Sequence, residues 1–140
     1  MITAAHCTDG QTPEGLKALV GDTTFALNNE ATSFVKAVKT IKQHPDYDSV
    51  TISNDITVLE LDSPIDLTAY PNIKPVCLPA KGTTFGGTTA IVSGWGTVSS
   101  GGYSNAHLHE VSVNVYNQGE CGAILDRSSL QGPWACDAHG

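Results

Sequence analysis

Short runs of β-branched residues alternate with turn-forming clusters along most of this chain. The cleanest alternation places Val111, Val113 and Val115 on one face of a strand and polar residues on the other. Short strands separated by turns are typical of an all-β sandwich or barrel. The strands predicted in this way are residues 34–41, 55–61, 88–93 and 108–116.

A proline-rich stretch between Asp62 and Gly87 separates the first two predicted strands from the last two. It holds four of the seven prolines of the chain, and proline removes a backbone donor from a sheet. We therefore expect an extended connection over residues 67–87 between two halves, residues 1–66 and 88–140. A short helix is predicted over residues 121–128, although Gly122 is unfavourable within it.

Composition and charge narrow the classes of function. Hydrophobic residues make up 40% of the chain, charged residues make up 15%, and glycine is plentiful, which suits a soluble β-rich domain. The formal charge of −7 gives an acidic surface that repels phosphates and anionic headgroups, so nucleic acid is not an expected partner. No apolar run reaches 18 residues, so no membrane-spanning helix is expected.

Four cysteines bear on the compartment. Cys7, Cys77, Cys121 and Cys136 form no C-x-x-C pair, so neither a zinc ribbon nor a thioredoxin motif is indicated. Disulfides formed in an oxidising compartment are favoured over free buried thiols.

Two side chains form a candidate acid–base pair. Peptide hydrolysis by a serine enzyme needs a serine nucleophile, a histidine that takes its proton and a carboxylate that orients the imidazole. His6 follows a run of small residues, and Asp55 opens an apolar strand. A carboxylate buried there needs a partner, and His6 is the candidate.

The chain resembles the trypsin- and chymotrypsin-like serine proteases at five motifs, which occur in the order of that family and cover nearly the whole chain. The resemblance implies that His6 is the general base and that Asp55 is the acid that orients it. The motifs are residues 2–7 (ITAAHC), 44–47 (HPDY), 54–59 (NDITVL), 75–79 (PVCLP) and 92–97 (VSGWGT).

The resemblance also implies a fold and an activity. The family fold is a double antiparallel β-barrel, and this chain is expected to be truncated at both ends. Residues 1–66 then hold the remainder of the first barrel, and residues 88–140 hold the first part of the second. The implied activity is that of a secreted, extracellular serine endopeptidase that acts on proteins or peptides without a cofactor.

The sequence departs from the family at the nucleophile. No Gly-Asp-Ser-Gly-Gly motif occurs, and Gly21-Asp22 is followed by threonines. We therefore interpret the chain as a fragment without the nucleophilic serine and expect the chain alone to be inactive. The alternative is a secreted non-catalytic homologue that acts as a binding or regulatory protein.

The resemblance assigns roles to the cysteines as well. Cys121 and Cys136 correspond to a second-barrel disulfide around a short helix. Cys77 lies where relatives bond a propeptide or light chain, and Cys7 lies where they bond a cysteine further upstream.

No metal site is expected. His107 and His109 share a face of a predicted strand, but an exposed pair is favoured over a metal site. Asp22 and Glu30 fall in a loop where some members of the family bind calcium, yet that loop carries few carboxylates.

Overall fold

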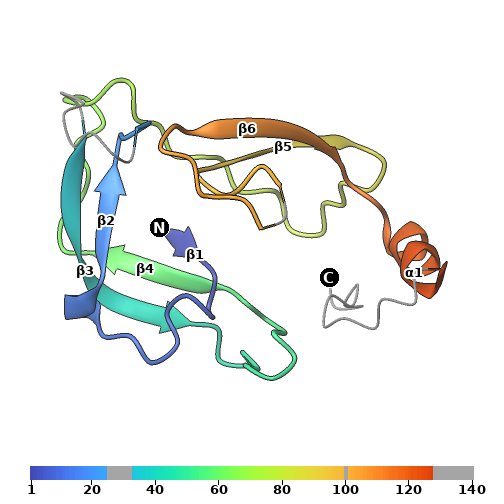
Figure 1. The fold of residues 1–140 in the computed structure, drawn as a ribbon. Helices are drawn as coiled ribbons and strands as arrows, with labels where there is room; N and C mark the ends of the chain where they lie inside the picture. The colour runs from blue at the N-terminus through green and yellow to red at the C-terminus, as the bar shows by residue number, and fades with distance from the viewer. Residues whose placement is uncertain (25–32, 100, 128–140) are drawn as a thin grey trace. The chain divides into compact units, whose positions relative to one another are not determined.

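The computed structural model describes residues 1–24, 33–99 and 101–127, and these residues form mostly β-strands (Figure 1). The all-β fold class predicted from the sequence is confirmed. In chain order the elements are β1 (Ile2–Thr3), the 3₁₀ helix η1 (Pro13–Gly15), β2 (Lys17–Val20), β3 (Phe34–Gln43), β4 (Thr57–Leu61), β5 (Thr89–Gly94), β6 (His109–Asn114) and the helix α1 (Gln118–Arg127).

The chain divides into two compact units. The first comprises residues 1–22 and 27–75, and the second comprises residues 23–26 and 76–140. The last boundary between the units falls between Pro75 and Val76, within the proline-rich stretch.

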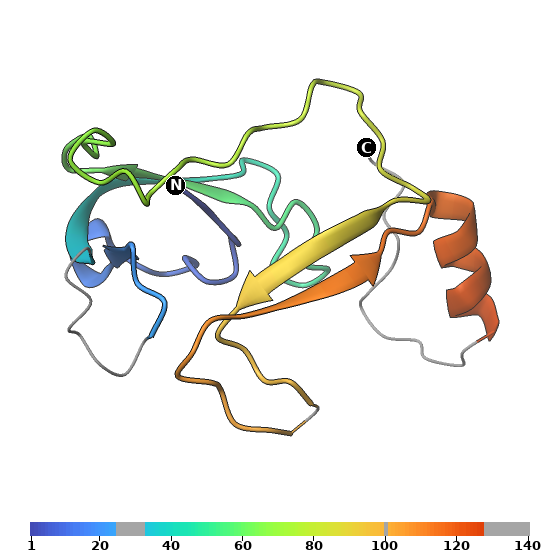
Figure 2. The same cartoon turned by 90° about the horizontal axis from the view of Figure 1, so that it is seen from above.

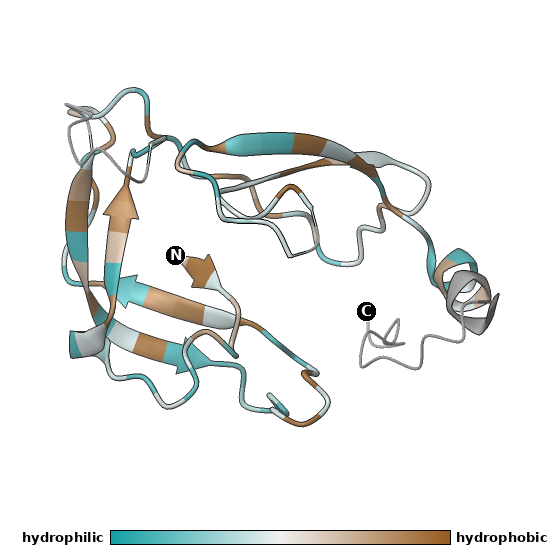
Figure 3. Ribbon diagram, in the orientation of Figure 1, coloured by the Kyte–Doolittle hydropathy of each residue, from teal (hydrophilic) through white to brown (hydrophobic). Residues whose placement is uncertain are grey.

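The first unit is built on a four-stranded antiparallel sheet in the order β1-β4-β3-β2. Strand β3 has ten residues in which a lysine recurs at every third position among mostly apolar side chains, as the bands along it in Figure 3 show. Its pairing with β4 shifts between Val38 and Thr40. A shift of this kind bends a strand and increases its twist, which agrees with the curl of β3 in Figure 1.

The core of the first unit consists of small and medium side chains. Ala5, Ala18, Val38 and Leu59 are buried, and Thr57 is only 1% exposed. Ala5 immediately precedes the candidate histidine, and Thr57 begins β4 just after the candidate aspartate. The best-buried residues of this unit therefore include the neighbours of the predicted site.

The second unit contains the two-stranded antiparallel sheet of β5 and β6, which run side by side in Figure 2. Val92 pairs with Val111 and Ala90 pairs with Val113, so the predicted alternation places these four side chains on one face. The side chains of that face are not covered: Val92 is 54% exposed, Val111 is 56% exposed and Val113 is 37% exposed. Val115 lies just beyond the end of β6.

Helix α1 begins at Gln118, three residues before the predicted start. The Asn117 side chain accepts a hydrogen bond from the backbone N–H of Glu120 at 2.9 Å, and the Glu120 carboxylate accepts one from the backbone N–H of Asn117 at 3.0 Å. This reciprocal capping fixes the first turn. Asn117 also lies close to Gly86, where an added Cβ would be 2.7 Å from the Cβ of Asn117.

Candidate active site

His6 and Asp55 lie in direct contact although 49 residues separate them. One carboxylate oxygen of Asp55 accepts a hydrogen bond from the His6 backbone N–H at 2.8 Å. The other lies 2.6 Å from the ring Nδ1 of His6. Two bonds from one residue fix both the position and the direction of the carboxylate.

Strand pairing brings these two residues together. Ile2 pairs with Val58 and Thr3 pairs with Thr57, so the segment that follows β1, which holds His6, lies beside the segment that precedes β4, which holds Asp55. Behind them the Thr8 hydroxyl lies 2.9 Å from the Thr57 hydroxyl and donates to the Ala5 carbonyl at 3.0 Å. These buried bonds connect the turn after His6 to the first residue of β4.

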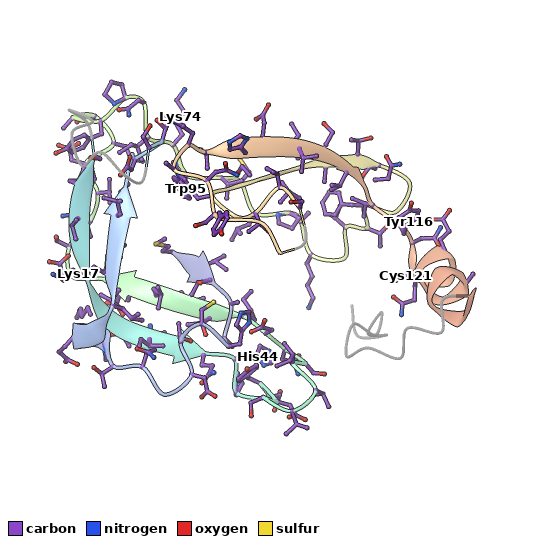
Figure 4. All side chains as sticks on the ribbon, in the orientation of Figure 1. Lys17, His44, Lys74, Trp95, Tyr116 and Cys121 are labelled. Atoms are coloured by element: carbon purple, nitrogen blue, oxygen red, sulfur yellow. The ribbon has the colours of Figure 1, made fainter. Side chains whose placement is uncertain are left out.

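The loop before β4 fixes the backbone next to Asp55 through Asn54. Asn54 donates from its side chain to the Asp46 carbonyl at 2.9 Å, and its backbone has a φ of 57°. Asparagine tolerates this left-handed conformation better than most residues. His44, labelled in Figure 4, lies at the start of this loop, where its ring accepts a hydrogen bond from the Asp46 backbone N–H.

Asp55 was expected to open the strand and to be buried, and the structure corrects both points. Strand β4 begins only at Thr57, because the turn at Asn54 precedes it, and the Asp55 side chain keeps 23% of its exposure. The His6 side chain is 55% exposed. The pair therefore lies at the surface of the first unit.

The hydrogen bonds control the ionisation of Asp55. The His6 backbone N–H holds the pKa of the Asp55 carboxyl below its ordinary range, partial desolvation opposes this effect, and the His6 ring adds to the lowering. An ionised carboxylate can only accept hydrogen bonds, so Nδ1 of His6 carries a proton. The neutral imidazole then has its lone pair on Nε2, the nitrogen that a general base requires.

Cys7 also contacts the histidine, and the sequence interpretation missed this contact. Its Sγ lies 3.4 Å from Nε2 of His6. The two residues are adjacent in the chain, but adjacency alone does not determine whether their side chains meet. The signal available in the sequence was therefore only the His-Cys dipeptide itself.

The predicted disulfide lies partly outside the described residues. Cys121 is on α1 (Figure 4), whereas Cys136 is not among the residues that the structure describes. Cys7 and Cys77 are exposed, and neither is bonded to another cysteine of the residues that the structure describes. The pairing of Cys121 with Cys136 therefore stays a prediction.

The residues considered for a metal site are placed only in part by the structure. The ring of His107 lies 3.4 Å from the hydroxyl of Thr24, and His109 begins β6. Asp22 is buried, and Glu30 lies outside the described residues. Within residues 1–24, 33–99 and 101–127, no three His, Cys, Asp or Glu side chains are grouped so that they could hold a metal ion.

The same described part of the chain has no helix that is long and apolar enough to span a membrane.

Several known proteins are similar in sequence to this chain. Trypsin-1 of Astacus astacus is 36% identical over 123 residues, which are 86% of this chain and 50% of that protein. Serine protease 1 of Rattus norvegicus is 34% identical over 124 residues, 88% of this chain and 47% of that protein. Serine protease filzig of Drosophila melanogaster is 37% identical over 122 residues, 86% of this chain but 7% of that protein.

The chain thus spans about half the length of the two shorter relatives and a small part of the third. The protein family described as Trypsin matches residues 1–133. This match covers nearly all of the sequence and both members of the His6–Asp55 pair. The chain therefore belongs to the trypsin family of serine proteases.

Proposed function

We propose that the protein is a serine-type endopeptidase in which His6 is the general base and Asp55 orients it. The observation that carries the proposal is the pair of hydrogen bonds from His6 to Asp55, at 2.8 Å from the backbone and 2.6 Å from the ring. They leave Nε2 as the basic nitrogen at an exposed position.

In the proposed reaction, Nε2 of His6 takes the proton of a serine hydroxyl as that oxygen attacks the substrate carbonyl. The imidazolium formed is stabilised by the ionised Asp55. It then gives the proton to the leaving amine, and a water molecule activated in the same way hydrolyses the ester. No cofactor takes part in this sequence of proton transfers.

The reaction needs a nucleophile that the 140 residues do not supply in a Gly-Asp-Ser-Gly-Gly motif. The proposal assigns it to protein sequence that follows Gly140. The absence of the motif also favours a second candidate: a non-catalytic homologue that binds a protein or regulates another protease. The residue at the nucleophile position of the full-length protein separates the two.

The proposal extends to partners and location. The substrates are proteins or peptides, and the protein is secreted to the extracellular space, where its cysteines are oxidised. In this proposal Cys77, which is exposed in a proline-flanked segment, pairs with a cysteine of a propeptide or light chain.

Labelling of the full-length, activated protein with a biotinylated fluorophosphonate tests this proposal. This reagent reacts with serines that an adjacent base has activated. We expect one labelled serine, with labelling lost in His6→Ala and strongly reduced in Asp55→Asn, but retained in His109→Ala. The 140-residue chain alone is expected to remain unlabelled. A labelled serine in His6→Ala, or no labelled serine in a folded full-length protein, overturns the peptidase proposal.

A further inference from the structure

We propose that Asp9 is a site of covalent modification, at which its side-chain carboxyl closes onto the backbone nitrogen of Gly10 and water opens the resulting imide to isoaspartate. Asp9-Gly10 is the only Asp-Gly pair in the sequence, which has no Asn-Gly pair. Both residues are exposed. Because the two reacting groups belong to neighbouring residues, the reaction needs only water.

The two residues form the centre of a tight turn at the surface of the first unit. The backbone N–H of Gln11 donates to the carbonyl of Thr8 at 3.0 Å and closes the turn around them. Gly10 has a φ of 68°, which glycine adopts about as readily as a negative φ. A Cβ added to Gly10 would meet no atom within 4 Å, so the space beside this residue is open.

Both reacting groups are also without hydrogen bonds. Within residues 1–24, 33–99 and 101–127, neither the carboxylate of Asp9 nor the backbone N–H of Gly10 has a hydrogen-bond partner. The carboxyl can therefore rotate about its side-chain bonds, and its carbon can reach the nitrogen without breaking an interaction. Glycine has no side chain that would hinder this approach.

Asp48 is the closest comparison, because the serine that follows it is also small. Its carboxylate accepts hydrogen bonds from the backbone N–H of Val50 at 2.8 Å and of Thr51 at 3.4 Å. These bonds hold the side chain in place, and the bond from Val50 contributes most to keeping the pKa of the Asp48 carboxyl below its ordinary range. Loss of water from a carboxyl needs its protonated form, so both effects slow imide formation at Asp48.

Asp46 is protected in a second way, through the amide that follows it. The backbone N–H of Tyr47 donates to the carbonyl of His44 at 3.1 Å. This hydrogen bond must break before the nitrogen can attack a carboxyl. Asp9 has neither kind of protection, since its carboxylate and the N–H of Gly10 are both unbonded among the described residues.

The reaction conserves atoms over its two steps. In the first step, the nitrogen of Gly10 forms a bond to Cγ of the protonated Asp9 carboxyl, and the carboxyl OH leaves as water with the proton of the nitrogen. In the second step, water adds to the imide. Cleavage of the new bond restores aspartate, whereas cleavage at the original backbone carbonyl leaves the chain connected through Cγ as isoaspartate. The water that is lost is regained, so the mass is unchanged and nothing is oxidised or reduced.

The modification would alter the support of the candidate site. Isoaspartate lengthens the backbone of the turn by one methylene group. Thr8, the first residue of the turn, is buried, and its hydroxyl donates to the Ala5 carbonyl and lies 2.9 Å from the Thr57 hydroxyl. A change in the turn therefore acts on the connection behind His6. This consequence rests on the proposed function, in which the position of His6 determines activity.

The test stores the folded 140-residue chain at neutral pH and maps isoaspartate by proteolysis and electron-transfer mass spectrometry, which separates isoaspartate from aspartate at equal mass. We expect isoaspartate to accumulate at Asp9 and to be absent at Asp48. In denaturing urea, where Asp48 loses its hydrogen bonds, we expect it at both positions. No peptidase activity is read, so failure of this inference is distinct from failure of the proposed function.

Three variants separate the Asp-Gly chemistry from other causes. Asp9→Glu should abolish the modification, because a glutamate would have to form a larger ring. Gly10→Asn should slow it, since asparagine tolerates the positive φ but adds a side chain beside the nitrogen. Thr51→Val, in the loop of Asp48, should leave the modification of Asp9 unchanged. The measurements on the wild-type chain stand by themselves if a variant fails to fold.

Three results would overturn the proposal. The first is an absence of isoaspartate at Asp9 in the folded wild-type chain when it forms in urea, because the fold then protects the turn. The second is its absence at Asp9 under both conditions. The third is equal accumulation at Asp9 and Asp48 in the folded chain, which would show that the hydrogen bonds of Asp48 give no protection.

Discussion

The hydroxyl groups of Thr8 and Thr57 lie 2.9 Å apart in the interior, each two residues after a member of the His6–Asp55 pair. A hydroxyl has one proton, and Thr8 gives its proton to the carbonyl of Ala5, so Thr57 is the donor between the two. The exposed His6–Asp55 pair and the buried Thr8–Thr57 pair therefore join the same two segments of the chain, and in each pair the residues are 49 apart.

Replacing either threonine by valine tests this connection. We expect Thr57→Val to lower the free energy of unfolding by about 1 kcal/mol and Thr8→Val by about 2 kcal/mol, because only Thr8 makes two of these bonds. Urea unfolding followed by circular dichroism measures both. Thr51→Val is the matched control, since its hydroxyl bond to Ser53 is exposed, and it should change stability by less than about 0.5 kcal/mol. A Thr8→Val chain as stable as this control would contradict the account.

The lowered pKa of Asp55 predicts a specific response to acid. A carboxyl group whose pKa is lower in the folded state stabilises the protein at any pH above its pKa in the unfolded state. This stabilisation is lost as the pH falls through its pKa in the folded state. The ordinary value for Asp55 is 3.8. The stability of the wild-type chain should thus fall more steeply than that of Asp55→Asn as the pH is lowered below this point.

Titration of the Asp55 carboxyl by NMR refines this prediction. The largest cause of the lowering is the backbone N–H of His6, which His6→Ala retains. The pKa in His6→Ala should therefore rise but stay below 3.8. A complete return to 3.8 would show that the ring, and not the backbone, controls the carboxyl.

Ile52 offers a test of strain in the loop that carries Asp55. Its φ of 57° lies in the left-handed region, which is costly for a β-branched side chain. Ile52→Asn should raise the free energy of unfolding by about 1 kcal/mol, because asparagine adopts this conformation more easily. Val50→Asn, at an exposed position of the same loop without a positive φ, should give no such gain. Equal effects of the two substitutions in urea unfolding would exclude backbone strain as the cause.

The alternation of side chains predicted the four longer strands well. The predicted strand at residues 34–41 is β3, which continues to Gln43, and the one at 88–93 is β5, shifted by one residue. Strands β1 and β2 were missed because two and four residues are too few to show a period. The start of α1 was placed too late because the Asn117–Glu120 capping pair was not recognised.

The motifs predicted which residues would form the candidate site, but not its geometry. The resemblance at residues 2–7 and 54–59 identified His6 and Asp55, and β1–β4 pairing brings them together. The contact of Cys7 with Nε2 depends on a side-chain rotamer, which no sequence pattern specifies. Strand β4 begins later than predicted because Asn54 has a positive φ. The apolar pattern of the sequence does not indicate this local backbone conformation.

The two sheets should differ in local stability. Strands β3 and β4 are the inner strands of a four-stranded sheet, whereas β5 and β6 form a two-stranded sheet with an exposed apolar face. A two-stranded sheet is marginally stable unless something covers it. Native-state hydrogen exchange should therefore show faster exchange for the paired amides of β5 and β6 than for those between β3 and β4. Slower exchange in β5 and β6 would mean that their apolar face is covered in solution.

The central claim is that His6, oriented by Asp55, is the base of a peptidase, and the most direct test is kcat/KM of the full-length activated protein on a peptide substrate. His6→Ala should lower kcat by about 10⁴–10⁶-fold with little change in KM, because the base acts in the transition state and not in binding. His109→Ala, which removes an exposed histidine of β6, should stay within about threefold of the wild type. A His6→Ala protein that retains wild-type kcat/KM would contradict the account.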